Sequence, residues 1–116
     1  MTIMDRYFEL SDVAGNDKNA FQELIDSFSD QAVFHSADGA KMSGKKEIED
    51  FFMNFFNKNV ILKHVWVTTE VENGLETSWA VVGKRIDGSI FALKGVDVAE
   101  LNNNGKIISL KVSFSK

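Results

Sequence analysis

The segment 32–39, which reads AVFHSADG, places three side chains that could do acid–base chemistry at the end of a short predicted strand. His35 could move a proton near neutral pH, Ser36 could donate a hydrogen bond, and Asp38 could act as a base. Asp38-Gly39 is also a turn signal, so the strand is expected to end there. Side chains alternate along a strand, which puts His35 on the face opposite Ser36. The segment is therefore either the edge of an active site or only the end of a strand.

A second candidate is an acid in a strand that is otherwise apolar. In the final predicted strand the apolar set, expected to face inward, is Leu110, Val112 and Phe114. A turn over 102–105 without a bulge would place Asp97 opposite Leu110, and Leu93 opposite Phe114. Directly opposed residues share a face, so Asp97 would point inward with the apolar set. Burial raises the pKa of a carboxyl group, and such groups cluster at functional sites.

The Asp87-Gly88 turn offers another reading of Asp97. If that turn joins its two strands symmetrically, Ser78 lies opposite Asp97. Asp97 would then be an ionised acid paired with Ser78 or with a buried water, rather than a neutral donor to a ligand. Both readings stay open at this point.

The elements that must position these residues can be predicted from periodicity. Helical spacing of apolar residues predicts helices over 2–14, 17–29 and 44–57, with Gly15-Asn16 ending the first helix and capping the second, and Ser43 capping the third. From about residue 60 to residue 115 the chain is rich in Val, Ile, Thr and Trp, with turn signals at Asn73-Gly74, Asp87-Gly88 and 102–105. This pattern predicts four long antiparallel strands. The expected fold class is α+β, a cone-shaped curved antiparallel sheet with three helices packed on its concave face.

Composition limits the function classes. The chain has 116 residues, which fits a single domain over 1–116, and its net charge of -4 disfavours nucleic acid as a partner. It has no Cys, and no signal peptide or membrane span is visible, so we expect a cytoplasmic protein and no membrane partner. The two His residues lie far apart in the sequence, which predicts no metal site. No phosphate-binding loop or nucleophile elbow is present, and we expect no cofactor.

Three stretches together resemble a known superfamily. They are RYFELSDVAGND, LIDSFSDQAVFHSADG and VDVAELNNNGKIISLKVSF, and they extend over nearly the whole chain. The chain resembles the nuclear-transport-factor-like superfamily and, within it, the branch of ketosteroid isomerases and SnoaL-like polyketide cyclases. The resemblance implies the cone fold, a homodimer formed through the sheet, and an apolar cavity. That fold also carries binding proteins and transport adaptors, so it does not fix the function.

The resemblance assigns roles to particular residues. Tyr7 falls where the isomerases keep a Tyr that donates a hydrogen bond to the substrate oxyanion, and Asp97 falls where they keep a protonated Asp as second donor. The position of the isomerase general base is Ser36, whose hydroxyl cannot accept a proton at neutral pH without a partner. We therefore expect that the protein is not a steroid-type isomerase, although Asp38 or His35 could substitute for the missing base.

The expected function is binding of a small hydrophobic molecule, with cofactor-free isomerase, cyclase or dehydratase chemistry if the protein is an enzyme. Tyr7 and Asp97 are the catalytic candidates, and the expected ligand-binding residues are Phe34, Ser36, Phe52, Leu93, Leu110, Val112 and Phe114. His64, Trp66 and Trp79 are interpreted as structural residues, with Trp79 on the outer face of the sheet beside Val96, Val98 and Lys111. The alternative is a dimeric interaction or carrier module without catalysis.

Overall fold

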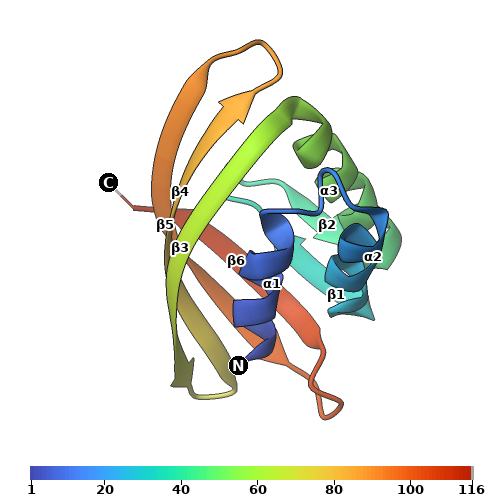
Figure 1. Ribbon diagram of the computed structural model, residues 1–116. Coiled ribbons are helices and arrows are strands. Elements are labelled where there is room, and N and C mark those ends of the chain that lie inside the picture. Colours follow the sequence, from blue (N-terminus) through green and yellow to red (C-terminus); the bar gives the residue numbers. More distant parts are fainter. Residues whose placement is uncertain (116) are drawn as a thin grey trace.

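The computed structural model describes residues 1–115 and contains three helices and six strands (Figure 1). In chain order these are α1 (Ile3–Ser11), α2 (Lys18–Asp26), β1 (Phe28–His35), β2 (Lys41–Ser43), α3 (Lys45–Lys58), β3 (Asn59–Val71), β4 (Gly74–Arg85), β5 (Ile90–Leu101) and β6 (Ile107–Phe114). The three predicted helices and the four long C-terminal strands are confirmed. The short strand β2 was not predicted.

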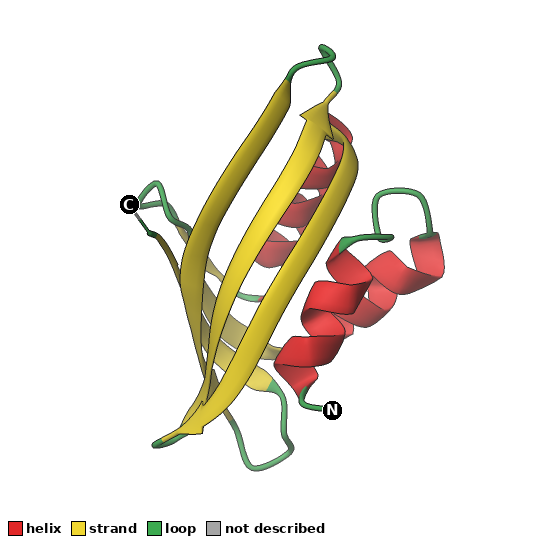
Figure 2. Cartoon of the chain, turned by 60° about the vertical axis from the view of Figure 1, so that its left-hand side comes forward, coloured by secondary structure: helices red, strands yellow, loops and turns green. Residues whose placement is uncertain are grey.

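The strands form one curved, unclosed sheet in the order β2-β1-β6-β5-β4-β3. β1 runs parallel to β6, and every other neighbouring pair is antiparallel. Figure 2 shows the three helices on one side of the long strands. The predicted α+β cone, with its helices on the concave face, is therefore confirmed. The space between the helices and β3–β6 is where a pocket can form.

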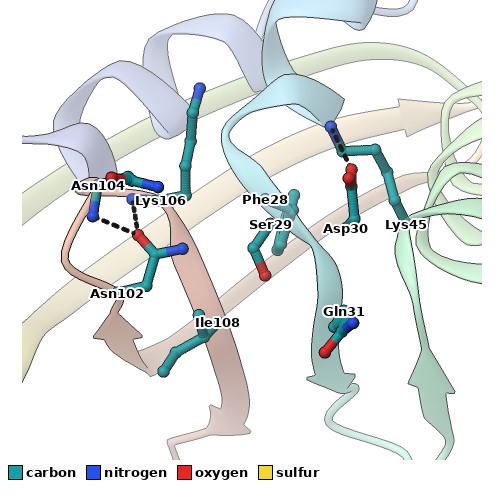
Figure 3. Close-up of a pocket in the computed structure, with 9 residues that line it drawn as sticks. All are labelled: Phe28, Ser29, Asp30, Gln31, Lys45, Asn102, Asn104, Lys106 and Ile108. Atoms are coloured by element: carbon teal, nitrogen blue, oxygen red, sulfur yellow. Dashed lines mark hydrogen bonds and ion pairs between the residues drawn. The ribbon is translucent and has the colours of Figure 1, made fainter.

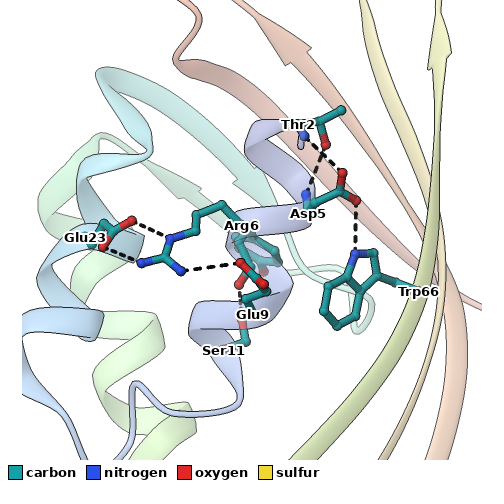
Figure 4. Close-up of polar contacts among 8 residues, drawn as sticks. Thr2, Asp5, Arg6, Glu9, Ser11, Glu23 and Trp66 are labelled. Carbon is teal, nitrogen blue, oxygen red and sulfur yellow. Dashed lines mark hydrogen bonds and ion pairs between the residues drawn. The ribbon is translucent and has the colours of Figure 1, made fainter.

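Helix α1 is fixed at its N-terminus by local and long-range hydrogen bonds (Figure 4). The Thr2 hydroxyl accepts a hydrogen bond from the backbone N–H of Asp5, and the Asp5 carboxylate accepts one from the backbone N–H of Thr2. The other Asp5 oxygen accepts a 3.0 Å hydrogen bond from Nε1 of Trp66 on β3. The Arg6 guanidinium donates two hydrogen bonds, of 2.7 and 2.9 Å, to the Glu23 carboxylate on α2. These contacts hold α1 against both the sheet and α2.

Several predicted boundaries are wrong. α1 ends at Ser11 rather than at residue 14, and the cap of α2 is Asp17, whose carboxylate accepts hydrogen bonds from the first turn of that helix. α2 ends at Asp26 rather than at residue 29, because β1 already begins at Phe28. Ser43 does not cap α3, because it belongs to β2 and its backbone N–H donates to the Glu47 carboxylate. The residue that precedes α3 is Gly44.

The register between β5 and β6 differs from the predicted one by two residues. The observed pairs include Asp97–Val112, Gly95–Phe114 and Ala99–Leu110. The predicted pairs Asp97–Leu110 and Leu93–Phe114 are therefore wrong. The turn holds one residue more than expected, with Gly105 in the left-handed region, and a β-bulge at the end of β5 adds a second shift. Two single-residue shifts preserve the alternation, so Asp97 still faces inward.

The register between β4 and β5 corrects the reading of Ser78. Thr77, not Ser78, lies opposite Asp97, because the turn after β4 has three residues rather than two. Ser78 therefore lies on the outer face and cannot be the partner of Asp97. The same shift turns Trp79 inward, where it is buried, so its predicted position on the outer face is wrong.

Candidate functional site

A pocket of about 400 Å³ lies between the helices and the inner face of the sheet. Its walls are mostly aromatic and aliphatic. They are formed by Tyr7, Phe8, Ser11, Phe34, Ser36, Ala37, Asp38, Phe51, Phe52, Phe55, His64, Trp79, Val81, Phe91, Leu93, Asp97, Val112 and Phe114. Leu93 and Phe114 are about half exposed, whereas Tyr7, Phe34 and Asp97 are buried. The pocket is thus apolar, with a few polar groups on its walls.

Asp97 is the buried acid of this pocket, with 2% of its surface exposed. Its Oδ1 accepts a 2.8 Å hydrogen bond from Nε1 of Trp79. Burial raises the pKa of Asp97 to about 7, because desolvation outweighs the hydrogen bond from Trp79, which lowers it. The carboxyl group is therefore substantially neutral below pH 7 and can donate a hydrogen bond through its second oxygen. Oδ2 has no hydrogen-bond partner among residues 1–115, and it is not fully buried.

Tyr7 supplies a second donor on the α1 wall. Its ring is buried against Phe8, Phe28 and Phe52, but its hydroxyl forms no hydrogen bond within the described chain and is not fully buried. Burial, and then the charge of Asp97, raises the pKa of the Tyr7 hydroxyl well above its ordinary value. Both effects keep the hydroxyl protonated. Tyr7 and Asp97 therefore present two neutral O–H groups to one apolar pocket.

His64 lines the pocket, although the sequence pattern favoured a structural role for it. Its Nδ1 lies 2.6 Å from Oδ1 of Asp12, the residue that follows α1. Its backbone N–H donates to both oxygens of the same carboxylate, at 3.1 and 3.2 Å. The ring packs edge-on against Phe8 and Trp79, with centroids 5.3 and 6.4 Å apart. The pocket thus contains an imidazole held by a carboxylate.

Ser36 and Asp38 lie at the rim of the pocket. The Ser36 hydroxyl donates to the Asp38 carboxylate, which also accepts a 3.1 Å hydrogen bond from the backbone N–H of Ala40. These bonds hold the pKa of Asp38 below its usual range. β1 ends at His35, as the Gly39 signal predicted, and the turn itself brings Asp38 to the pocket.

Most residues predicted for the site come together in this pocket. Tyr7, Asp97, Phe34, Ser36, Phe52, Leu93, Val112 and Phe114 all line it. Leu110 does not: it is fully buried in the core on the same strand face. His35 lies outside the lining, in agreement with its predicted position on the other face of the strand. The sequence reasoning missed His64 and Trp79 as pocket residues.

A larger and more polar hollow of about 610 Å³ lies elsewhere, between β1 and the β5–β6 turn (Figure 3). Its two amines are already occupied. Lys45 lies 3.4 Å from Asp26 and 3.5 Å from Asp30, and Lys106 donates to the backbone oxygen of Asp26. Because both amines of this hollow are already paired, the apolar pocket is the better candidate site.

Two further observations concern metal sites and membrane spans. Within residues 1–115, no group of three or more His, Cys, Asp or Glu side chains is placed to hold a metal ion. In the same range, no helix has both the length and the apolar character needed to cross a membrane.

Comparison with known proteins identifies the superfamily. No family model matches the chain, and no curated protein matches it. Among solved structures, an "NTF2-like protein of unknown function" from Exiguobacterium sp. 255-15 is 39% identical, with 99% of each chain covered and a TM-score of 0.89. A "putative polyketide cyclase" from Xanthomonas campestris pv. campestris shares the fold at 11% identity, with 97% of this chain and 87% of that chain covered and a TM-score of 0.78. This chain belongs to the nuclear-transport-factor-like superfamily.

Proposed function

We propose that the pocket binds a small, largely apolar molecule whose carbonyl or enol oxygen accepts hydrogen bonds from Tyr7 and from neutral Asp97. The observation that carries this proposal is a buried Asp97 carboxyl group and a Tyr7 hydroxyl that line the same pocket; one oxygen of Asp97 and the Tyr7 hydroxyl have no hydrogen-bond partner among residues 1–115. The pocket volume of about 400 Å³ lies within the usual range of ligand sites, roughly 300–1,000 Å³. Apolar walls with a few convergent polar groups are typical of such sites.

The same two donors would suit cofactor-free acid–base chemistry. Hydrogen bonds from fixed donors stabilise an oxyanion that develops when a proton leaves the carbon next to a carbonyl. Isomerisation, cyclisation and dehydration of carbonyl compounds all pass through such an enolate. The steroid-isomerase variant of this chemistry is not proposed, because Ser36 stands where that branch has its base.

An acceptor-only ketone is the sharpest probe of this proposal. We expect 2-acetylnaphthalene to bind in calorimetric titrations at pH 6, and to bind about tenfold more weakly for each pH unit above the Asp97 pKa, because ionised Asp97 cannot donate. Tyr7→Phe removes one donor and should weaken binding by about 1 kcal/mol. Asp97→Asn keeps an N–H donor, so binding at pH 6 should persist while the pH dependence disappears.

Asp30→Asn is the matched control, because Asp30 is an acid with 91% of its side chain exposed and lies outside the pocket. It should leave both the affinity and its pH dependence unchanged. Binding that is independent of pH in the unmodified protein would contradict a neutral Asp97 donor. Absence of ketone binding would remove the proposal altogether.

A second candidate role is supported by the outer face of the sheet. Four exposed valines project from the outer face of β3, β4 and β5. They are Val65, Val67, Val82 and Val98, with 70%, 67%, 53% and 41% of their surface exposed. We propose that this face joins two copies of the chain, as the family resemblance implies. A dimer with an empty pocket would favour a non-catalytic interaction module.

A cytoplasmic location also stays a prediction.

A further inference from the structure

We infer that His64, held in place by Asp12, is the base that takes a proton from the carbon next to the ligand carbonyl in this pocket. The inference rests on the proposed function, because it needs a carbonyl held by Tyr7 and Asp97. It assigns to His64 the role of general base, which Ser36 cannot perform.

The first support is that Asp12 occupies only one of the two ring nitrogens of His64. Asp12 contacts Nδ1, and Asp12 does not line the pocket, whereas His64 does. The carboxylate therefore lies behind the ring, and Nε2 is the remaining nitrogen. Nε2 has no hydrogen-bond partner within residues 1–115. Since every fully buried side-chain nitrogen or oxygen in that range has one, Nε2 is accessible.

The second support is the fixed tautomer. A carboxylate accepts hydrogen bonds, so the 2.6 Å contact places the proton of a neutral ring on Nδ1 and leaves the lone pair on Nε2. β3 is an edge strand, and the backbone N–H of His64 is directed to Asp12 at its open edge. Three contacts with one carboxylate thus fix both the ring and the strand that carries it. The same carboxylate would stabilise the imidazolium that forms when Nε2 takes a proton.

The third support is proximity to the proposed oxyanion donors. The His64 ring lies 6.4 Å from the Trp79 ring, and Trp79 donates to Asp97. His64 and Asp97 therefore both lie beside Trp79 on the sheet wall of the pocket, and Tyr7 lines the same pocket from α1.

The other candidate bases are weaker. Asp38 lies at the rim, and its carboxylate already accepts hydrogen bonds from Ser36 and from Ala40, which lower its basicity. His35 lies outside the pocket lining.

The proposed step is the enolisation of the bound ketone. Nε2 takes the proton from the carbon, and the electron pair of that C–H bond forms the C=C bond of an enolate. The electron pair of the carbonyl π bond moves to oxygen, where Tyr7 and Asp97 donate hydrogen bonds. Return of a proton from Nε2 to carbon regenerates the ketone. In D₂O the proton on Nε2 is exchanged for a deuteron from the solvent, and return of that deuteron to carbon labels the methyl group of 2-acetylnaphthalene without any other net reaction.

The first experiment uses this exchange. We expect the unmodified protein to accelerate deuterium incorporation into the methyl group, followed by proton NMR, and His64→Gln to abolish the acceleration. His35→Gln is the matched control, because His35 is the other of the two histidines in the chain and should leave the rate unchanged. Asp12→Asn should slow exchange about tenfold or more. Ring ¹⁵N NMR of Asp12→Asn should show loss of the Nδ1–H tautomer, which a purely structural role for Asp12 would not change.

The second experiment does not depend on turnover. The α-bromo derivative, 2-(bromoacetyl)naphthalene, should alkylate Nε2 of His64: a C–N bond forms, the C–Br bond breaks, and bromide leaves. The chain has no Cys to compete. Peptide mass spectrometry should find His64 modified much faster than His35, and excess 2-acetylnaphthalene should protect it.

The outcomes separate the two proposals. Calorimetric binding with the expected pH dependence, together with selective labelling and His64-dependent exchange, would support both. Binding without selective labelling, or exchange that survives His64→Gln, would overturn the inference and leave the proposed function intact. If the ketone does not bind, the proposed function fails, and the role of His64 falls with it.

Discussion

Asp97 should make the stability of the protein fall as the pH rises. Its pKa is about 7 in the folded chain, against an ordinary value of 3.8, because folding removes the carboxyl group from water. Between these two values the folded chain holds a proton that the unfolded chain has lost. The stabilisation of the neutral acid is fully present below about pH 4, is lost progressively up to about pH 7, and changes no further above that pH.

The magnitude follows from the difference between the two pKa values. Each pH unit is worth about 1.4 kcal/mol, so the full window corresponds to about 4 kcal/mol, of which about 2.5 kcal/mol falls between pH 5 and pH 8. This is a large share of the 5–15 kcal/mol that stabilises a typical domain. The opposite trend is expected of ordinary paired carboxylates, whose stabilising effect grows with pH.

The assay is urea unfolding of the unmodified protein and of Asp97→Asn at several values between pH 5 and pH 8. Other titrating groups are common to both chains, so the difference in unfolding free energy isolates Asp97. We expect that difference to shift by about 2.5 kcal/mol in favour of Asp97→Asn as the pH rises. A difference that stays constant to within about 0.5 kcal/mol would refute the reasoning, because Asp97 would then ionise at a similar pH in the folded and unfolded chains.

Three further predictions concern packing and assembly. Gly95→Ala should lower the free energy of unfolding by more than about 2 kcal/mol in urea titrations, because an added Cβ would lie 2.6 Å from the Trp79 ring and 2.2 Å from a backbone oxygen of β6. Leu110→Ala should cost about 2–5 kcal/mol by the same assay, yet leave ketone affinity unchanged, since Leu110 belongs to the core and not to the pocket lining. The double change Val65→Lys with Val67→Lys should convert a dimer to a monomer in light scattering with little effect on the fold. A chain that is already monomeric would contradict the sheet-face dimer.

Much of the fold could be predicted because its elements carry regular patterns. The helices show apolar residues at helical spacing, and the Asn73-Gly74 signal falls at the observed turn between β3 and β4. β2 has only three residues and no pattern of its own. Strand registers were predicted less well, because a hairpin register depends on loop length to a single residue. The three-residue loop after β4, with Gly88 in the left-handed region, was enough to exchange Ser78 for Thr77 opposite Asp97.

The site was predictable where alternation alone decided the question. Asp97 shares a strand face with residues that had to be inward, and two shifts of one residue each left that conclusion unchanged. In β3, alternation did not identify the inner face. Val65 and Val67 are exposed, so the outer face of this strand is apolar and resembles a core face. His64 could not be assigned for this reason, and its partner Asp12 lies 52 residues away. Only the tertiary structure brings that pair together.

The two proposed roles place opposite demands on the protonation of the pocket. Asp97 must keep its proton in order to donate to the oxyanion, whereas His64 must be without a proton on Nε2 in order to accept one. The rate of exchange of the ketone methyl group should therefore fall as the pH rises through about 7, where Asp97 loses its proton. Asp97→Asn, which keeps a donor that cannot ionise, should remove this fall in rate. A fall in rate near pH 7 that persists in Asp97→Asn would show that another group sets it, and the neutral acid would then have no part in the reaction.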